Sequence, residues 1–186
     1  MVDSPRALRI AERFTSRTFR LVTETVRYPD GSTGDLHVVR HPGAVAILPL
    51  RLAPRRIVLL SPYRHAAGRP IWEIPAGTRD RPGEPPARCA RRELVEETGY
   101  RAGSIAPVGR FYTAPGFCDE LMHLFVAWRL EAGEAIGRDA DELIDVHVLS
   151  WVEASRMVRE GRIEDAKTLV ALLWLDAFLG RASRVE

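Results

Sequence analysis

The chain contains 186 residues, of which 27 are basic and 25 acidic, so its formal net charge is +2. This small excess excludes the strongly basic surface typical of proteins that bind nucleic acid or an anionic membrane, and a hydrophobic content of 46% excludes a disordered chain. No run approaches the ~20 apolar residues of a membrane span, and the chain begins without the apolar stretch of a secretory signal. We therefore expect one large domain, or a domain with a small appendage, in the cytoplasm.

The N-terminal part of the chain predicts a short helix followed by a β-hairpin. Residues 5–14 are assigned to the short helix. Residues 18–27 are rich in β-branched and aromatic side chains, which is typical of a strand, and residues 35–40 predict the returning strand. Proline and glycine between the two strands are turn residues. We expect this N-terminal region, residues 1–42, to be separate from a main domain over residues 43–186.

The main domain predicts strands mixed with helices. The predicted strands cover residues 44–50, 57–60, 71–74, 105–113, 121–130 and 144–151, and the predicted helices cover residues 85–98, 152–160 and 164–179. Strands with helices after each group favour a mixed sheet between helical layers. The predicted fold class is therefore α/β (α+β), with the antiparallel hairpin added at the N-terminus.

The helix predicted over residues 85–98 carries acidic side chains where they do not stabilise it. Glu93, Glu96 and Glu97 stand at i, i+3 and i+4, so they share one face of the helix. Carboxylates near the C-terminus of a helix oppose its dipole. A bound divalent cation explains them, because carboxylate oxygens form the hard ligand set that Mg²⁺ or Mn²⁺ prefers. The alternative is an ordinary solvated acidic face.

The residues around this helix match the motif of the Nudix hydrolase family, G-x5-E-x7-R-E-U-x-E-E-x-G-U, in which U is a bulky apolar residue. The matching residues are Gly77, Glu84, Arg92, Glu93, Glu96, Glu97 and Gly99, with Tyr100 in the last position. Six residues instead of five separate Gly77 from Glu84, and the additional residue falls in a predicted loop. The chain therefore resembles Nudix hydrolases.

The resemblance implies an α/β/α sandwich with a mixed sheet and a metal-dependent hydrolase. Glu93, Glu96, Glu97 and the carbonyl of Ala76 would bind Mg²⁺, with Mn²⁺ as the alternative cofactor. Arg92 would orient the glutamates by pairing with the loop glutamate of the motif. The implied reaction is the hydrolysis of a nucleoside diphosphate linked to another moiety, by metal-activated water and without a covalent intermediate.

Outside the motif, the chain is similar to the ADP-ribose pyrophosphatase branch of this family. The similarity is carried by Tyr63-Arg64, by Trp72-Glu73-Ile74-Pro75-Ala76-Gly77 and by the loop 112–120. A proline about 15 residues past the motif is a mark of that branch, and Pro115 has this spacing. The resemblance implies hydrolysis of ADP-ribose to AMP and ribose 5-phosphate in a homodimer, with N-terminal strands that cross to the partner subunit.

Several residues outside the motif are candidate substrate contacts. Arg64 is expected at a phosphate or at the terminal ribose, because a planar guanidinium suits phosphate oxygens, and Glu73 is expected at a polar group of the substrate. Phe19 or Arg17 would stack on adenine. Each has a structural alternative, such as a loop arginine for Arg64 and a core side chain for Phe19. The loop candidates are Pro115, Gly116 and Phe117.

The resemblance places the general base in an acidic loop late in the chain. Glu142 is the first candidate, followed by Asp141 and Asp139. The alternative for any of them is a solvated loop residue.

Other functions remain open at this point. The substrate could be another nucleotide sugar, FAD or NADH, because the pocket outside the motif decides this choice. A non-catalytic, ligand-sensing Nudix domain is disfavoured, since the chain keeps every motif glutamate and has no basic C-terminal module. A purely structural protein would leave the acidic helix unexplained. The expected partners are a small nucleoside diphosphate and a second copy of the chain, without nucleic acid or membrane.

Overall fold

The computed structural model describes residues 4–52, 54–133 and 145–182. The strands are β1 (Arg6–Thr15), β2 (Arg20–Arg27), β3 (Thr33–Arg40), β4 (Ala44–Leu52), β5 (Arg55–Leu60), β6 (Tyr63–Arg64), β7 (Arg69–Pro70), β8 (Ala76–Thr78), β9 (Tyr100–Tyr112), β10 (Leu121–Ala132) and β11 (Val146–Ser150). The helices are α1 (Pro86–Thr98), α2 (Trp151–Arg159) and α3 (Ala166–Ala182), and His65–Ala67 form a 3-10 turn, η1.

The chain divides into two compact units. The smaller unit contains Met1–Gly43 and Phe111–Met122, and the larger unit contains Ala44–Arg110 and His123–Glu186. Each unit has a sheet of its own. That residues 1–42 and 43–186 are separate folding domains stays a prediction.

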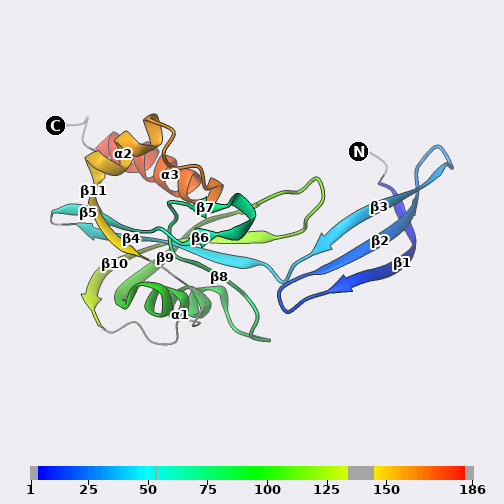
Figure 1. Cartoon of the computed structure of the whole chain (residues 1–186), viewed down its shortest axis with the longest axis horizontal. Coiled ribbons are helices and arrows are strands. Elements are labelled where there is room, and N and C mark those ends of the chain that lie inside the picture. The colour runs from blue at the N-terminus through cyan, green and yellow to red at the C-terminus, as the bar shows by residue number, and fades with distance from the viewer. Residues whose placement is uncertain (1–3, 53, 134–144, 183–186) are drawn as a thin grey trace. The chain divides into compact units, whose positions relative to one another are not determined.

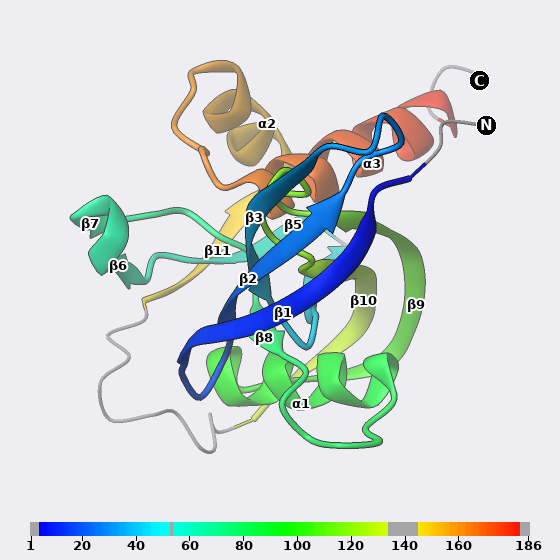
Figure 2. The same cartoon turned by 90° about the vertical axis from the view of Figure 1, so that its right-hand side faces the viewer.

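The smaller unit is built on a three-stranded antiparallel sheet in the order β1-β2-β3 (Figure 2). Strands β2 and β3 confirm the predicted hairpin. The predicted short helix over residues 5–14 is wrong, because these residues form β1. Alanine, leucine, arginine and glutamate favour helices in isolation, but backbone pairing with β2 from Arg6 to Thr15 overrides that preference.

The segment between β9 and β10 belongs to the smaller unit and is tied to the end of β3. The backbone N–H of Val39 donates to the carbonyl of Phe117 at 2.8 Å, and the N–H of Asp119 donates to the carbonyl of Val39 at 3.1 Å. The carboxylate of Asp119 also accepts from the Arg40 guanidinium at 2.9 Å and from the backbone N–H of His41 at 2.7 Å. These bonds fix the loop that sequence analysis assigned to the substrate.

The larger unit is a six-stranded sheet between helices. Its strand order is β11-β5-β4-β10-β9, and β8 pairs with β4 beside this path. Figure 1 shows α2 and α3 on one side of the sheet and α1 on the other, which confirms the predicted sandwich. The core on the α1 side contains Val45 and Ile47 of β4, Leu94 of α1 and Phe125 of β10. Among the described helices, none is long and apolar enough to cross a membrane.

The stretch between β5 and α1 differs in detail from its prediction. The strand expected over residues 71–74 is reduced to one bridge, between Glu73 and Leu60, and a short strand, β8, lies where a loop was expected. Pro75 has no N–H to donate, so a continuous strand cannot form here. The carbonyl of Pro75 nevertheless accepts from the N–H of Ile47 at 2.8 Å, which keeps this stretch on the sheet.

Candidate active site

Helix α1 carries the motif glutamates and has well-defined ends. It follows Pro85, has proline in its first turn, and ends at Gly99, whose φ of 75° lies in the left-handed region that glycine favours. The N–H of Gly99 donates to the carbonyl of Val95 at 2.9 Å. The buried Leu94 packs toward β4, so the acidic face of the helix is fixed relative to the sheet.

Arg92 is the centre of the charged cluster on α1. Its guanidinium lies 3.1 Å from the carboxylate of Glu84, 2.6 Å from Glu93 and 2.8 Å from Glu96. Asp80 lies 3.6 Å away. The expected pairing of Arg92 with Glu84 is therefore present. The same guanidinium connects the loop before α1 to two of the three motif glutamates on the helix.

The pKa values in this cluster reflect burial and crowding of like charges. Burial raises the pKa of Glu93 to about 7, the charge of Arg92 opposes this rise, and the neighbouring Glu96 adds to it. Hydrogen bonding to Arg92 holds the pKa of Glu84 below its usual range. Burial would lower the pKa of Arg92, but its acidic neighbours raise it overall. The cluster therefore contains more negative charge than Arg92 alone can balance.

The backbone of β8 lies directly against two glutamates of α1. The N–H of Ala76 donates to the carboxylate of Glu97 at 2.9 Å. A Cβ atom placed on Gly77 would lie 2.0 Å from the carboxyl carbon of Glu93. A side chain at position 77 would therefore occupy the place that the Glu93 carboxylate fills. This close approach explains why glycine stands at this motif position.

The donor set of this site fits a divalent cation. Three carboxylates and the nearby carbonyl of Ala76 are oxygen ligands, and the missing Cβ of Gly77 leaves room for the Glu93 carboxylate. In the described residues, no three acidic, histidine or cysteine side chains already face one another as ligands of a metal. Arg92 pairs instead with Glu93 and Glu96, and Glu97 binds the Ala76 N–H. Metal binding by these residues stays a prediction.

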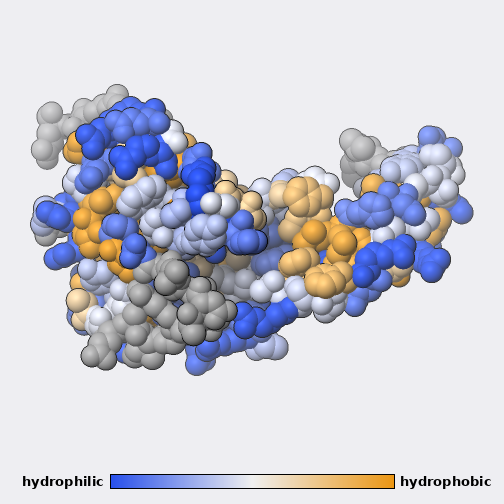
Figure 3. Space-filling view, in the orientation of Figure 1, coloured by the Kyte–Doolittle hydropathy of each residue, from blue (hydrophilic) through white to orange (hydrophobic). Residues whose placement is uncertain are grey.

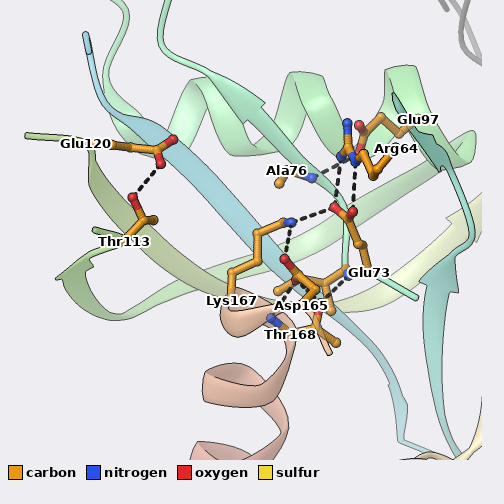
Figure 4. A network of polar contacts seen from close by, with 10 residues as sticks. Arg64, Glu73, Ala76, Glu97, Thr113, Glu120, Asp165, Lys167 and Thr168 are labelled. Carbon is orange, nitrogen blue, oxygen red and sulfur yellow. Dashed lines mark hydrogen bonds and ion pairs between the residues drawn. The ribbon is translucent and has the colours of Figure 1, made fainter. Parts of the chain in front are cut away.

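Arg64 and Glu73, expected separately as substrate contacts, are brought together (Figure 4). The Nε and Nη2 atoms of Arg64 each donate to one carboxylate oxygen of Glu73 at 2.8 Å. The Nζ atom of Lys167 on α3 lies 2.5 Å from the same carboxylate. Glu73 is only 4% exposed, so its two oxygens are engaged by cations of the protein itself.

The charges around Glu73 keep it ionised although it is buried. Burial raises its pKa, but the hydrogen bonds from Arg64 and the charge of Lys167 outweigh burial, so the pKa lies below its ordinary value of 4.5. The hydrogen bond to Glu73 raises the pKa of Arg64, and the charge of Glu97 contributes to the same rise. Arg64 thus interacts electrostatically with Glu97 on α1.

Sequence reasoning missed two residues in this part of the protein. Lys167 is the single lysine among 27 basic residues. The choice of lysine at this one position was the feature of the sequence that could have pointed to a special role. Thr168, the next residue, is fully buried and accepts from the backbone N–H of Ile74 at 2.8 Å. Neither contact could be read from spacing, because 94 positions separate each pair of partners.

The remaining candidates lie in the smaller unit or outside the described residues. Phe19 is 37% exposed, and its ring contacts that of Phe14 at 6.0 Å between centroids. Arg17, Pro115, Gly116 and Phe117 are all exposed. The last three lie on the loop that is hydrogen-bonded to β3. The general-base candidates Asp139, Asp141 and Glu142 lie outside the described residues.

Cys89 is excluded as a nucleophile by its surroundings. Its side chain is fully buried in the core between α1 and β4. Burial raises the pKa of its thiol to about 12, so the reactive thiolate is scarce at neutral pH. The chemistry of the site therefore rests on carboxylates and guanidinium groups.

Comparisons with known proteins identify the family of the chain. Residues 40–173 match the sequence profile of the NUDIX domain. The chain is 39% identical to the methanol dehydrogenase activator of Bacillus methanolicus, over 91% of each chain, and 37% identical to the ADP-ribose pyrophosphatase of Bacillus subtilis, over 87% of each. It is 35% identical to the GDP-mannose pyrophosphatase of Cronobacter sakazakii, over 88% of this chain and 91% of that protein.

A solved structure shows the same fold. The crystal structure of an ADP compounds hydrolase matches with a TM-score of 0.84 and 21% identity, and the match covers 100% of this chain and 99% of the other. The chain therefore belongs to the Nudix hydrolase family. The predicted family and the predicted enzyme class, a hydrolase, are confirmed.

The ion pairs of Glu73 predict a pH-dependent contribution to stability. Glu73→Gln should lower the free energy of unfolding at pH 7 by about 1–3 kcal/mol, because it leaves the cationic donors Arg64 and Lys167 with a neutral acceptor. The folded pKa of Glu73 is lowered, so its contribution is present above pH 4.5 and is lost as pH falls through the folded pKa. Urea unfolding of both proteins between pH 7 and pH 3 measures the difference.

Glu160→Gln is the matched control for this measurement. Glu160 is an exposed residue that pairs with Arg156 at 3.7 Å, and exposed pairs contribute about 0–1 kcal/mol. Its substitution should change stability little at any pH. If Glu73→Gln lowered the free energy of unfolding as much at pH 3 as at pH 7, the stabilisation would not come from the ionised carboxylate of Glu73.

Proposed function

We propose that this Nudix protein is a metal-dependent pyrophosphatase that hydrolyses ADP-ribose to AMP and ribose 5-phosphate. The observation that carries the proposal is the direct contact of the Ala76–Gly77 backbone with the carboxylates of Glu97 and Glu93. This contact gathers carbonyl and carboxylate oxygens at one place. Relatives named as ADP-ribose pyrophosphatases, 37% identical over most of the chain, support the substrate.

The chain's own residues would hold the cation and the substrate. Glu93, Glu96, Glu97 and the carbonyl of Ala76 are the proposed ligands of Mg²⁺, with Mn²⁺ as the alternative. When bound, such a cation neutralises the diphosphate and lowers the pKa of water. Arg92 is proposed to orient the glutamates, because its guanidinium contacts two of them.

Arg64 is the proposed phosphate contact. Its side chain is 48% exposed, while the carboxylate that binds it is buried, so solvent reaches about half of the Arg64 side chain. Because Glu73 already binds two cations, its proposed role changes from contacting the substrate to orienting Arg64. For adenine we retain Phe19 or Arg17. Glu142, followed by Asp141 and Asp139, stays the proposed general base. The proposed loop contacts are Pro115, Gly116 and Phe117.

A second candidate substrate is GDP-mannose. The relative named as a GDP-mannose pyrophosphatase is 35% identical over nearly the same share of the chain as the ADP-ribose pyrophosphatase. The two substrates share the diphosphate that the glutamates and Arg64 would bind. They differ in base and sugar, for which the motif glutamates are not proposed as contacts.

We also propose that the protein is a cytoplasmic homodimer formed through the sheet of the smaller unit. Several large apolar side chains on this sheet and its turns are exposed, namely Leu8, Ile10, Phe14, Phe19 and Leu36. Figure 3 shows hydrophobic surface on the N-terminal strands. Contiguous exposed apolar surface is typical of an interface between proteins. A second copy of the chain offers the same face and could cover it.

The proposed reaction is tested with a substrate panel at fixed Mg²⁺. ADP-ribose should be turned over with the highest kcat/KM and should release AMP, measured by chromatography of the nucleotide products. GDP-mannose, FAD and NADH complete the panel. Good turnover of GDP-mannose without turnover of ADP-ribose would reassign the substrate.

Glu97→Gln tests the proposed role of Glu97 as a metal ligand. It should lower kcat by at least ~100-fold, since it removes a negative ligand of the cation, while circular dichroism stays that of the wild type. An unchanged kcat would remove Glu97 from the metal site.

The dimer proposal is tested by placing a charge on the exposed sheet. Ile10 is 60% exposed on β1, and Ile10→Glu should shift the mass in sedimentation equilibrium from twice 20.8 kDa toward 20.8 kDa. Val152→Glu is the control, because Val152 is 73% exposed on α2 of the larger unit and should leave the mass unchanged. A monomeric wild type, or an Ile10→Glu protein that stays dimeric, would contradict the proposal.

A further inference from the structure

The short segment from Glu73 to Ala76 is held by four different elements. The backbone of Glu73 exchanges two hydrogen bonds with Leu60 of β5, at 2.7 and 2.9 Å. The carbonyl of Pro75 accepts from β4, and the N–H of Ala76 donates to Glu97 of α1. The N–H of Ile74, between them, donates to the Thr168 hydroxyl of α3. The path that leads to Ala76 is therefore fixed at nearly every residue.

The first turn of α3 is built to make this contact. Asp165 precedes the helix, and one of its carboxylate oxygens accepts from the backbone N–H of Thr168 at 3.0 Å and from the Thr168 hydroxyl at 2.6 Å. The hydroxyl of Thr168 thus donates to Asp165 and accepts from Ile74. Because Thr168 is fully buried, water cannot replace either bond.

Lys167 connects the same turn to the side chain of Glu73. Its Nζ atom lies 2.9 Å from the other carboxylate oxygen of Asp165 and 2.5 Å from Glu73. Glu73 in turn holds Arg64 through two hydrogen bonds. Figure 4 shows these residues as one chain of contacts from α3 to Arg64, with Ala76 and Glu97 beside it. Two cations and two carboxylates balance one another along it.

We propose that Asp165, Lys167 and Thr168 are positioning residues of the active site. Thr168 fixes the distance between α3 and the segment that carries the Ala76 carbonyl. Lys167 binds the same carboxylate of Glu73 as Arg64 does, and so fixes the orientation of the Arg64 guanidinium. The inference rests on the proposed function of this site as a metal-dependent diphosphate hydrolase. It assigns to the start of the C-terminal helix a role in metal and phosphate binding, although none of its side chains is a proposed ligand.

Thr168→Val separates this role from simple packing. Valine has nearly the shape of threonine but cannot accept from the Ile74 N–H or donate to Asp165. The buried N–H would then lack a partner, and the segment should move away from α3. We expect the affinity for Mn²⁺, measured without substrate by electron paramagnetic resonance, to fall about 10–100-fold, as it does when groups that orient metal ligands are removed. The value of kcat for ADP-ribose should fall with it.

Two matched variants identify the cause of such a loss. Thr168→Ser keeps the hydroxyl and loses the buried methyl group, so it should restore Mn²⁺ affinity. Leu172→Ala removes a buried side chain from the same helix and should lower the unfolding midpoint without lowering Mn²⁺ affinity. Equal affinities in the wild type and Thr168→Val, or a loss that follows the unfolding midpoint across all three variants, would overturn the proposal.

Lys167→Met tests the second half of the inference. Methionine has a similar length without the charge, and Lys167 is partly reachable by solvent at 12% exposure, so the fold should persist. We expect the KM for ADP-ribose to rise about tenfold with a smaller change in kcat, because Arg64 would lose its fixed direction. An unchanged KM would overturn the role of Lys167.

Failure of the proposed substrate is distinguishable from failure of this inference. If the wild type leaves ADP-ribose intact while Thr168→Val loses Mn²⁺ affinity and Thr168→Ser keeps it, the substrate is wrong and the positioning role of Thr168 holds. A wild type that binds no Mn²⁺ would overturn both.

Discussion

The structure depends on the close approach of one short stretch of backbone to one helix. Ala76 binds Glu97 through its N–H, and Gly77 lies so near Glu93 that a Cβ atom would overlap the carboxylate. This approach requires a glycine at position 77, a helix α1 that is held in place by its apolar face, and a strand β8 that is held in place on the sheet. The sheet supplies the last two, because β4 contacts both α1 and β8.

Charge balance is the second constraint. Buried carboxylates are costly unless a cation or a hydrogen bond compensates them. Arg92 compensates Glu84, Glu93 and Glu96 only in part, because burial, together with the neighbouring Glu96, still raises the pKa of Glu93 against the charge of Arg92. A divalent cation would complete the balance. Around Glu73, in contrast, Arg64 and Lys167 already compensate the buried carboxylate.

Local patterns allowed the motif helix to be predicted from sequence, together with the positions of most strands along the chain. The charges and glycines of α1 act within a few residues of one another, so spacing reveals them. The strand β1 was missed because its side chains favour a helix and only pairing with β2 decides otherwise. The contacts of Lys167 and Thr168 were missed because tertiary structure alone brings α3 to the segment before Ala76.

The most direct test of this account is the Mn²⁺ affinity of Gly77→Ala, compared with that of Gly109→Ala, where an added Cβ meets nothing within 4 Å. The added methyl group at position 77 displaces only the end of a flexible side chain, so both variants should fold. The account predicts a loss of at least ~10-fold for Gly77→Ala and none for Gly109→Ala. Equal affinities for the two variants would contradict it.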